Sequence, residues 1–172
     1  TNRALLGIIV AAIFVLLSQL TVMSLAGYVY PNVYGSAAAQ STASLLGTVV
    51  MLIVCAPFAS KLAARFGKKE LAVASSICSA LVWLVCLIWR PASVWGFVAC
   101  YILANIGMGF FNTIIWAMIT DVIDDAEVRS GIREDGTIYS VYSFARKLGQ
   151  AFSSGLVGAL LGIIGYTEAT AF

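Results

Sequence analysis

Lys147 places a charged amine deep inside an apolar stretch of the chain. It follows Gly136 by eleven positions, which is about 16 Å along a helix and close to the middle of a bilayer. Polar residues recur around it at steps of three or four and therefore share one helix face. They are Thr137, Ser140, Ser143, Gln150 and Ser154. A charge at this depth normally faces a bundle interior or a water-filled cavity, so this face is expected to bind a polar ligand.

Other interpretations of this region stay open. Lys147 could be a snorkelling side chain, with neighbouring hydroxyls that bond back to their own helix. Arg146 points about 100° away from Lys147, beside Tyr139 and Tyr142. Its position is as consistent with a structural role as with contact to a ligand.

Asn105, Asn112 and Trp116 form a second polar face, because they are seven and then four residues apart. Two amides beside an indole are typical of a sugar platform, in which hydroxyl partners accompany an aromatic ring. Alternatively, the amides hold helices together and Trp116 belongs to an interfacial belt.

Asp121 and Asp124 lie in an acidic run of the kind that holds Mg²⁺ and a diphosphate in membrane prenyltransferases. That chemistry uses two facing acidic clusters, and the sequence contains only one. The preferred interpretation is a charged hinge, in which the two aspartates pair with Arg129, Arg133 or the basic loop 61–69 and stabilise a closed state.

The composition places these residues in a membrane protein. Of the 172 residues, 61% are hydrophobic and 10% are charged, whereas soluble domains carry about 25% charged residues. An ordinary soluble domain is therefore excluded. A net charge of +2 and the absence of His argue against a nucleic-acid partner and against a metal site built from His. The four cysteines lie singly in apolar runs and are interpreted as small buried residues.

Five apolar spans alternate with polar connectors, and each span is long enough to cross a bilayer, which needs roughly 20 residues. The spans cover about 4–30, 38–59, 71–89, 94–120 and 136–165. Pro31-Asn32 is expected to end the first span, because this pair breaks helices. The predicted fold is all-α, a transmembrane helical bundle that forms a single domain over residues 1–172.

Lys and Arg are distributed unevenly between the two sides of this bundle. Seven lie on one side and Arg90 alone lies on the other. The seven are Arg3, Lys61, Arg65, Lys68, Lys69, Arg129 and Arg133. Because basic loops stay in the cytoplasm, we expect an integral membrane protein whose N-terminus and two charged connectors are cytoplasmic and whose spans contact membrane lipids.

The stretch Ser60-Lys-Leu-Ala-Ala-Arg65-Phe-Gly67-Lys68-Lys69 resembles a loop of the major facilitator superfamily. The pattern of that loop is close to G-x-L-A-D-R-F-G-R-K, and here Ser60 and Ala64 replace its Gly and Asp. The resemblance implies that the loop joins helices eight and nine, and that Arg65 and Lys68 take part in cytoplasmic gating.

The C-terminal third of the chain is similar to the glycoside-pentoside-hexuronide:cation symporters. An acidic run, an arginine turn and a helical lysine occur in the order found in that family. They are Asp121-Val-Ile-Asp124-Asp125-Ala-Glu127, Arg133-Glu134-Asp135-Gly136 and Lys147. The resemblance covers the whole chain as helices seven to eleven of a twelve-helix transporter, that is, as a C-terminal half.

This resemblance also implies roles for particular residues. Lys147 matches a helix-eleven lysine near the sugar and cation sites, and Trp116 matches an aromatic at the cytoplasmic end of helix ten. Asp121, Asp124 and Arg133 match the cytoplasmic gating loop. No acidic residue lies within a predicted span, so the coupling cation, Na⁺ or H⁺, is expected to bind mainly in a missing N-terminal half. No other cofactor is expected.

The preferred hypothesis is part of a secondary active transporter of the bacterial cytoplasmic membrane, which moves a sugar or glycoside with a cation by alternating access. The expected substrate-binding residues are Lys147, Trp116, Asn112, Asn105, Ser143, Ser140 and Gln150. One alternative is a membrane scaffold or regulatory homologue that does not transport. The other is a Mg²⁺-dependent intramembrane prenyltransferase, although an enzyme is not expected.

Overall fold

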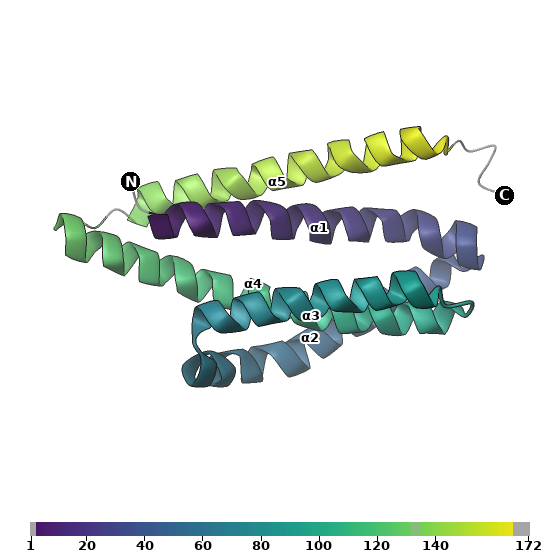
Figure 1. Cartoon of the computed structure of the whole chain (residues 1–172), viewed down its shortest axis with the longest axis horizontal. Coiled ribbons are helices and arrows are strands. Elements are labelled where there is room, and N and C mark those ends of the chain that lie inside the picture. The colour runs from purple at the N-terminus through teal and green to yellow at the C-terminus, as the bar shows by residue number, and fades with distance from the viewer. Residues whose placement is uncertain (1–2, 132, 134, 167–172) are drawn as a thin grey trace. The chain divides into compact units, whose positions relative to one another are not determined.

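Five long helices make up the regular structure of the chain. The computed structural model describes residues 3–131, 133 and 135–166. The helices are α1 (Arg3–Tyr34), α2 (Ala37–Phe66), α3 (Lys68–Trp89), α4 (Val94–Ser130) and α5 (Asp135–Ile164) (Figure 1). All five are long and apolar enough to cross a membrane. The predicted all-α membrane fold with five spans is confirmed.

Helix α1 does not end at Pro31-Asn32, so that prediction is wrong. The helix continues through Pro31 to Tyr34. A proline removes one backbone N–H, but long apolar helices tolerate this loss when their other hydrogen bonds stay intact. The end lies at Gly35, whose φ is +62°. There the Ser36 amide donates to the Tyr30 carbonyl over 3.0 Å, and the Ser36 hydroxyl accepts from the Ala39 amide that opens α2.

The predicted basic loop 61–69 is almost entirely helical, which corrects a second expectation. Helix α2 runs to Phe66 and α3 begins at Lys68, so Gly67 alone forms the turn. Gly67 has a φ of +96°, which disfavours any residue with a Cβ. A Cβ at Gly67 would also collide with the carboxylate of Glu70. One glycine therefore reverses the chain between two helices.

Helix α4 extends ten residues beyond the predicted span, because the charged connector from Asp121 onward is also helical. Its 37 residues measure about 55 Å, against about 30 Å for the hydrocarbon core. Val122 and Ile123 are 5% and 1% exposed, so this extension keeps a buried apolar face while its acids face outward. It ends at Gly131, whose amide donates to the Glu127 carbonyl over 2.8 Å.

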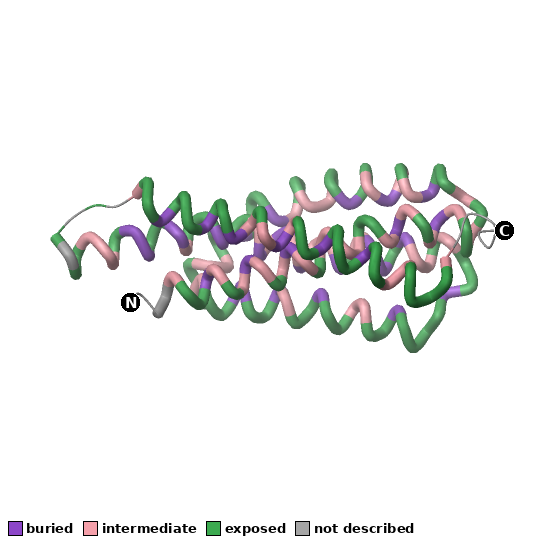
Figure 2. The backbone as a smooth tube through the Cα atoms, turned by 90° about the horizontal axis from the view of Figure 1, so that it is seen from above, coloured by how far each residue is buried: buried purple, intermediate pink, exposed green. Residues whose placement is uncertain are grey.

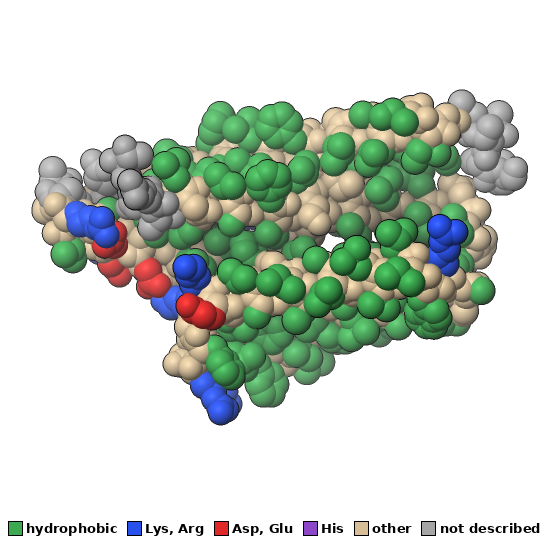
Figure 3. Space-filling view, in the orientation of Figure 1, with side chains coloured by type: hydrophobic (Ala, Val, Ile, Leu, Met, Phe, Trp, Pro, Cys, Tyr) green, Lys and Arg blue, Asp and Glu red, His purple; other side chains and the backbone are tan. Residues whose placement is uncertain are grey.

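The residues group into two compact units, and α1 and α4 each pass through both. One unit contains the chain up to Tyr28 together with the chain from Met118 onward, and the other contains residues 29–117. Along the helices, buried positions alternate with exposed ones (Figure 2). Hydrophobic side chains cover much of the long helical faces (Figure 3), as expected for helices whose solvent is lipid.

In the first unit, α1 and α5 pack closely through small residues. A Cβ at Gly149 would lie 3.2 Å from the Ile13 carbonyl oxygen and 3.4 Å from the Leu16 side chain. The hydroxyls of Thr21 and Ser153 are hydrogen-bonded over 3.1 Å, and Ser153 is 1% exposed. Small and hydroxylated residues at such a contact are typical of helix packing in membranes.

In the unit 29–117, α4 packs against both α2 and α3. A Cβ at Gly109 would lie 2.7 Å from the Cys55 sulfur on α2, which donates to the Ile106 carbonyl. On the α3 side, the Ser79 hydroxyl donates to the Ala104 carbonyl over 3.0 Å. Three of the four cysteines are buried as predicted, but Cys78 is exposed.

Aromatic rings of α1, α3 and α4 contact one another near the end of α1, the end of α3 and the start of α4. Tyr30 of α1 makes an edge contact with Phe97 of α4, with ring centroids 5.2 Å apart. Trp83 of α3 lies 6.1 Å from Phe97 and 6.3 Å from Tyr101. The Tyr34 hydroxyl donates to the Pro91 carbonyl over 2.9 Å, which ties the end of α1 to the α3–α4 connection.

Candidate functional site

The polar face of α5 lies opposite the face that packs against α1. The packed face consists of Ile138, Tyr142, Ala145, Gly149, Ser153 and Val157. Lys147, Ser140, Ser143 and Ser154 are exposed, and Gln150 is half-buried. In the described part of the chain, this polar face is therefore not covered by another helix.

Lys147 is held within this face by its neighbour one turn along. Its Nζ donates to the Gln150 side-chain oxygen over 3.2 Å. Gln150 lies toward the C-terminus, so the amine leans away from the nearer end of α5 at Asp135. Snorkelling would take the amine the other way, toward the nearer interface.

The serines of this face bond in part to their own helix. The Ser140 hydroxyl donates to the Gly136 carbonyl over 2.6 Å, and the Ser154 hydroxyl donates to the Gln150 carbonyl over 3.2 Å. These are the local bonds that the alternative interpretation describes. Each hydroxyl still has lone pairs that can accept from a ligand. The face thus offers one ammonium, one amide and several hydroxyls.

Arg146 occupies a different position from Lys147. Its guanidinium carbon lies 5.8 Å from the ring centre of Tyr142, and Tyr142 is 2% exposed on the face that packs against α1. Tyr139 is 38% exposed by comparison. Arg146 is therefore placed at the margin between the packed face of α5 and its open side.

On α4, Asn105 of the predicted sugar platform bonds to its own helix. The Asn105 amide nitrogen donates to the Tyr101 carbonyl of its own helix over 2.8 Å. Asn105 also lies beside Gly47 of α2, where an added Cβ would be 4.0 Å from the Asn105 Cβ. Asn112 is half-buried and Trp116 is 46% exposed. The Asn105 amide nitrogen is thus engaged within α4, and the substrate-binding role of the three residues stays a prediction.

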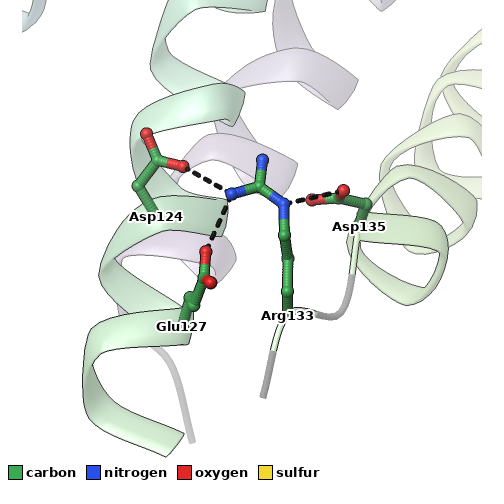
Figure 4. Close-up of polar contacts among 4 residues, drawn as sticks. All are labelled: Asp124, Glu127, Arg133 and Asp135. Carbon is green, nitrogen blue, oxygen red and sulfur yellow. Dashed lines mark hydrogen bonds and ion pairs between the residues drawn. The ribbon is translucent and has the colours of Figure 1, made fainter. Parts of the chain in front are cut away.

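The α4–α5 connection is organised around one arginine (Figure 4). Arg133 contacts Glu127 at 2.8 Å, Asp135 at 2.9 Å and Asp124 at 3.4 Å. Hydrogen bonds that Arg133 donates to Asp135 and Glu127 raise the pKa of its guanidinium further above its ordinary value, so this cation stays charged at any physiological pH. The cluster links the end of α4 to the start of α5.

Only part of this cluster was identified from the sequence. The predicted gating pair of Asp124 with Arg133 is present, but Glu127 and Asp135 make the shorter contacts. Glu127 could have been found, because it lies three residues after Asp124 on the same helix face. Asp121 is exposed on α4. Arg65 and Lys68 flank the Gly67 turn in the other unit, where the Arg65 guanidinium lies 5.4 Å from the Phe66 ring centre.

This arrangement disfavours a Mg²⁺-diphosphate site. Asp124 faces the Arg133 guanidinium, and Asp125 pairs with Arg129 over 3.0 Å within α4. A carboxylate that already neutralises a cation binds Mg²⁺ less readily, because it must first lose that partner. The acidic run therefore serves ion pairing.

Comparison with known proteins shows the family. Residues 1–171 match the family described as MFS/sugar transport protein. The chain belongs to this family. The chain is 34% identical over 170 residues to the uncharacterized symporter YjmB of Bacillus subtilis, and the match covers 96% of this chain and 36% of that protein. It is 29% identical over 168 residues to the glucuronide carrier protein homolog of Escherichia coli, with the same coverage. No solved structure matches it.

The chain spans about a third of the length of these curated relatives. This confirms the predicted resemblance to sugar:cation symporters and is consistent with a C-terminal half. Half-bundles of such proteins pack against a second half through faces that line a central path. The uncovered polar face of α5 is of the kind that such an arrangement requires.

Proposed function

We propose that this chain forms helices seven to eleven of a secondary active transporter, which moves a sugar or glycoside together with Na⁺ or H⁺ by alternating access. Family membership and the partial coverage of longer symporters support this proposal. Its task is transport, not catalysis, and the partner of its open surface is the N-terminal half of the same transporter.

The open polar face of α5 carries the proposal. An ammonium, an amide and hydroxyls at mid-membrane depth are costly against lipid tails. A hydrated cavity between two halves removes this cost and brings the same groups to a sugar. Lys147, Gln150, Ser140 and Ser143 are the proposed substrate contacts. The spacing of Trp116 and Asn112 on α4 also supports a role in sugar binding, and Asn105 lies beside Gly47 of α2.

The charges on α5 favour a substrate with an anionic group. Arg146 and Lys147 add two cations to the middle of α5, and no acid lies within the five predicted spans. A carboxylate or sulfonate on a sugar would compensate part of this charge through charge-assisted hydrogen bonds. One relative is named a glucuronide carrier protein homolog, and a glucuronide carries a carboxylate.

The cation and the orientation follow from the same distribution of charge. Acids that could bind Na⁺ or H⁺ at mid-membrane depth would come from the N-terminal half. Seven basic residues against one support an orientation in which the N-terminus of this segment is cytoplasmic and the protein lies in the cytoplasmic membrane of a bacterium. The Arg133 cluster is then a cytoplasmic gate.

Substitution of Lys147 in the full-length transporter tests the function. Lys147→Leu should weaken sugar binding by about ten- to a hundredfold, because one charge-assisted hydrogen bond contributes about 1.5–3 kcal/mol. Lys147→Arg should not restore binding, because a planar guanidinium cannot replace a compact ammonium. Binding and cation-driven uptake in vesicles would be measured with a glucuronide and with the corresponding neutral glucoside.

Arg90→Leu is the matched control, since it also removes one positive charge, but from the C-terminal end of α3 and outside the polar face of α5. It should bind and accumulate sugar as the wild type does. Normal uptake by both Lys147 variants would reject the site. Wild-type protein that folds but never accumulates any sugar would favour the scaffold alternative. A preference for the neutral glucoside would reject the anionic substrate while leaving sugar transport in place.

A further inference from the structure

The α2–α3 turn carries a concentrated positive charge. Residues 60–70 contain Lys61, Arg65, Lys68 and Lys69 and a single acid, Glu70. Lys61, Arg65 and Lys69 are exposed. Among the residues that the structure describes, no ion pair involves these three cations. Their charge is therefore available to a partner.

The two basic residues of α2 share one face with the exposed Phe58 ring, and the exposed Phe66 ring lies next to Arg65. Phe58, Lys61 and Arg65 follow at steps of three and four, so they lie along one side of the helix. The Lys61 amine lies 6.0 Å from the Phe58 ring centre. Phe58 and Phe66 are 49% and 59% exposed. We call this surface the basic turn. It consists of Phe58, Lys61, Arg65 and Phe66 on α2 together with Lys69 on α3.

The basic turn lies where the apolar part of both helices ends. The 24 residues from Ala37 to Ser60 contain no charge and measure about 36 Å as a helix. The 19 residues from Leu71 to Trp89 contain none either and measure about 28 Å. Both lengths approximate the hydrocarbon core. Lys61 and Lys69 are thus placed at the level of the lipid headgroups.

Aromatic side chains at this depth pack favourably at the boundary between acyl chains and headgroups. The cations beside them can bind the phosphate of an anionic lipid headgroup. The Gly67 turn fixes the two sets of cations at neighbouring helix ends, and the Arg65 fork can bind phosphate oxygens in pairs. We propose that the basic turn is a binding site for the headgroup of an anionic phospholipid. A lipid bound there joins the ends of α2 and α3 at the membrane surface.

Basic residues on this side also direct membrane insertion, and that role requires no bound lipid. The test must therefore measure lipid on protein that is already correctly inserted. The full-length transporter would be purified in detergent and titrated with phosphatidylglycerol or phosphatidylcholine, and bound lipid would be counted by native mass spectrometry. Labelling of a cysteine at Ser93 would verify orientation in cells before purification.

The double variant Lys61→Gln/Arg65→Gln should bind phosphatidylglycerol about ten- to thirtyfold more weakly than the wild type, because each cation near an anionic surface contributes about fivefold. The charge-retaining variant Lys61→Arg/Arg65→Lys should bind as the wild type does. Arg90→Gln/Arg129→Gln removes the same net charge elsewhere and should also leave binding intact. High salt should weaken binding to the wild type.

Four results would overturn the proposal. The first is that the double glutamine variant binds phosphatidylglycerol as well as the wild type does. The second is that the control with Arg90 and Arg129 replaced loses as much lipid as the double glutamine variant. Equal retention of phosphatidylcholine would show that charge is not recognised. Displacement of the lipid by inorganic phosphate at matched ionic strength would assign the cations to a soluble phosphate instead of a headgroup.

Discussion

Gly107 allows the backbones of α3 and α4 to approach each other closely. A Cβ there would lie 2.7 Å from the Ser75 carbonyl oxygen and 3.0 Å from the Ser79 Cβ. We therefore expect Gly107→Ala to force the helices apart, weaken the Ser79 to Ala104 hydrogen bond and destabilise the protein by about 1–3 kcal/mol. Thermal unfolding of the detergent-solubilised transporter would measure the loss.

Gly155→Ala is the comparison for this substitution. Among the described residues, no atom beyond the neighbouring turns of α5 lies within 4 Å of a Cβ added at Gly155, and alanine favours a helix more than glycine does. This variant should lose less stability than Gly107→Ala. A Gly107→Ala protein as stable as the wild type would show that α3 and α4 do not approach as described.

For single residues, the sequence predicts how deep a side chain lies in the membrane and which side chains share a helix face. It does not predict which groups a side chain bonds. The position of Lys147 in an apolar span and the periodic serines follow from counting residues. That its amine bonds Gln150, while Asn105 bonds its own helix, depends on rotamers and on what each helix packs against. Those are properties of the folded chain.

Among the elements, the connection between α4 and α5 depends on the charge of one side chain. Arg133→Gln would leave Asp124, Glu127 and Asp135 near one another without their shared cation, and like charges repel. We expect the distance between spin labels at Val128 on α4 and Tyr139 on α5 to become broader. Double electron–electron resonance on the full-length transporter would measure this distribution.

Arg129→Gln is the matched control, because the ion pair of Arg129 among the described residues is with Asp125, inside α4. Its distribution should equal that of the wild type. Since the side chains of the Arg133 cluster are about half exposed, high salt should broaden the wild-type distribution in the same direction. An unchanged distribution in Arg133→Gln would remove this cluster from the gate.

The helices themselves were predictable because a bilayer demands apolar segments of a set length. The residues at which the helices end were harder to predict. Charge and proline are weak stop signals when one face of a helix stays buried, as Val122 and Ile123 show beyond Asp121. The ends of α1, α2 and α4 lie at Gly35, Gly67 and Gly131, each with positive φ, whereas the end of α3 lies at Arg90, directly before Pro91, with a φ of +45°. Conformational freedom of the backbone, more than polarity, sets where α1, α2 and α4 end.

For the molecule as a whole, the side of the membrane on which each end of α3 lies is the most direct test of the proposed arrangement. Lys69 near its start and Ser93 beyond its end are both exposed. In a background with Cys55, Cys78, Cys86 and Cys100 replaced, Lys69→Cys should react with an impermeant maleimide only after the cells are lysed. Ser93→Cys should react in intact cells, because the positive-inside rule places seven cations opposite Arg90. Reversed labelling would invert the proposed orientation and place the Arg133 cluster outside. Labelling of both positions in intact cells would show that the basic turn does not fix one orientation.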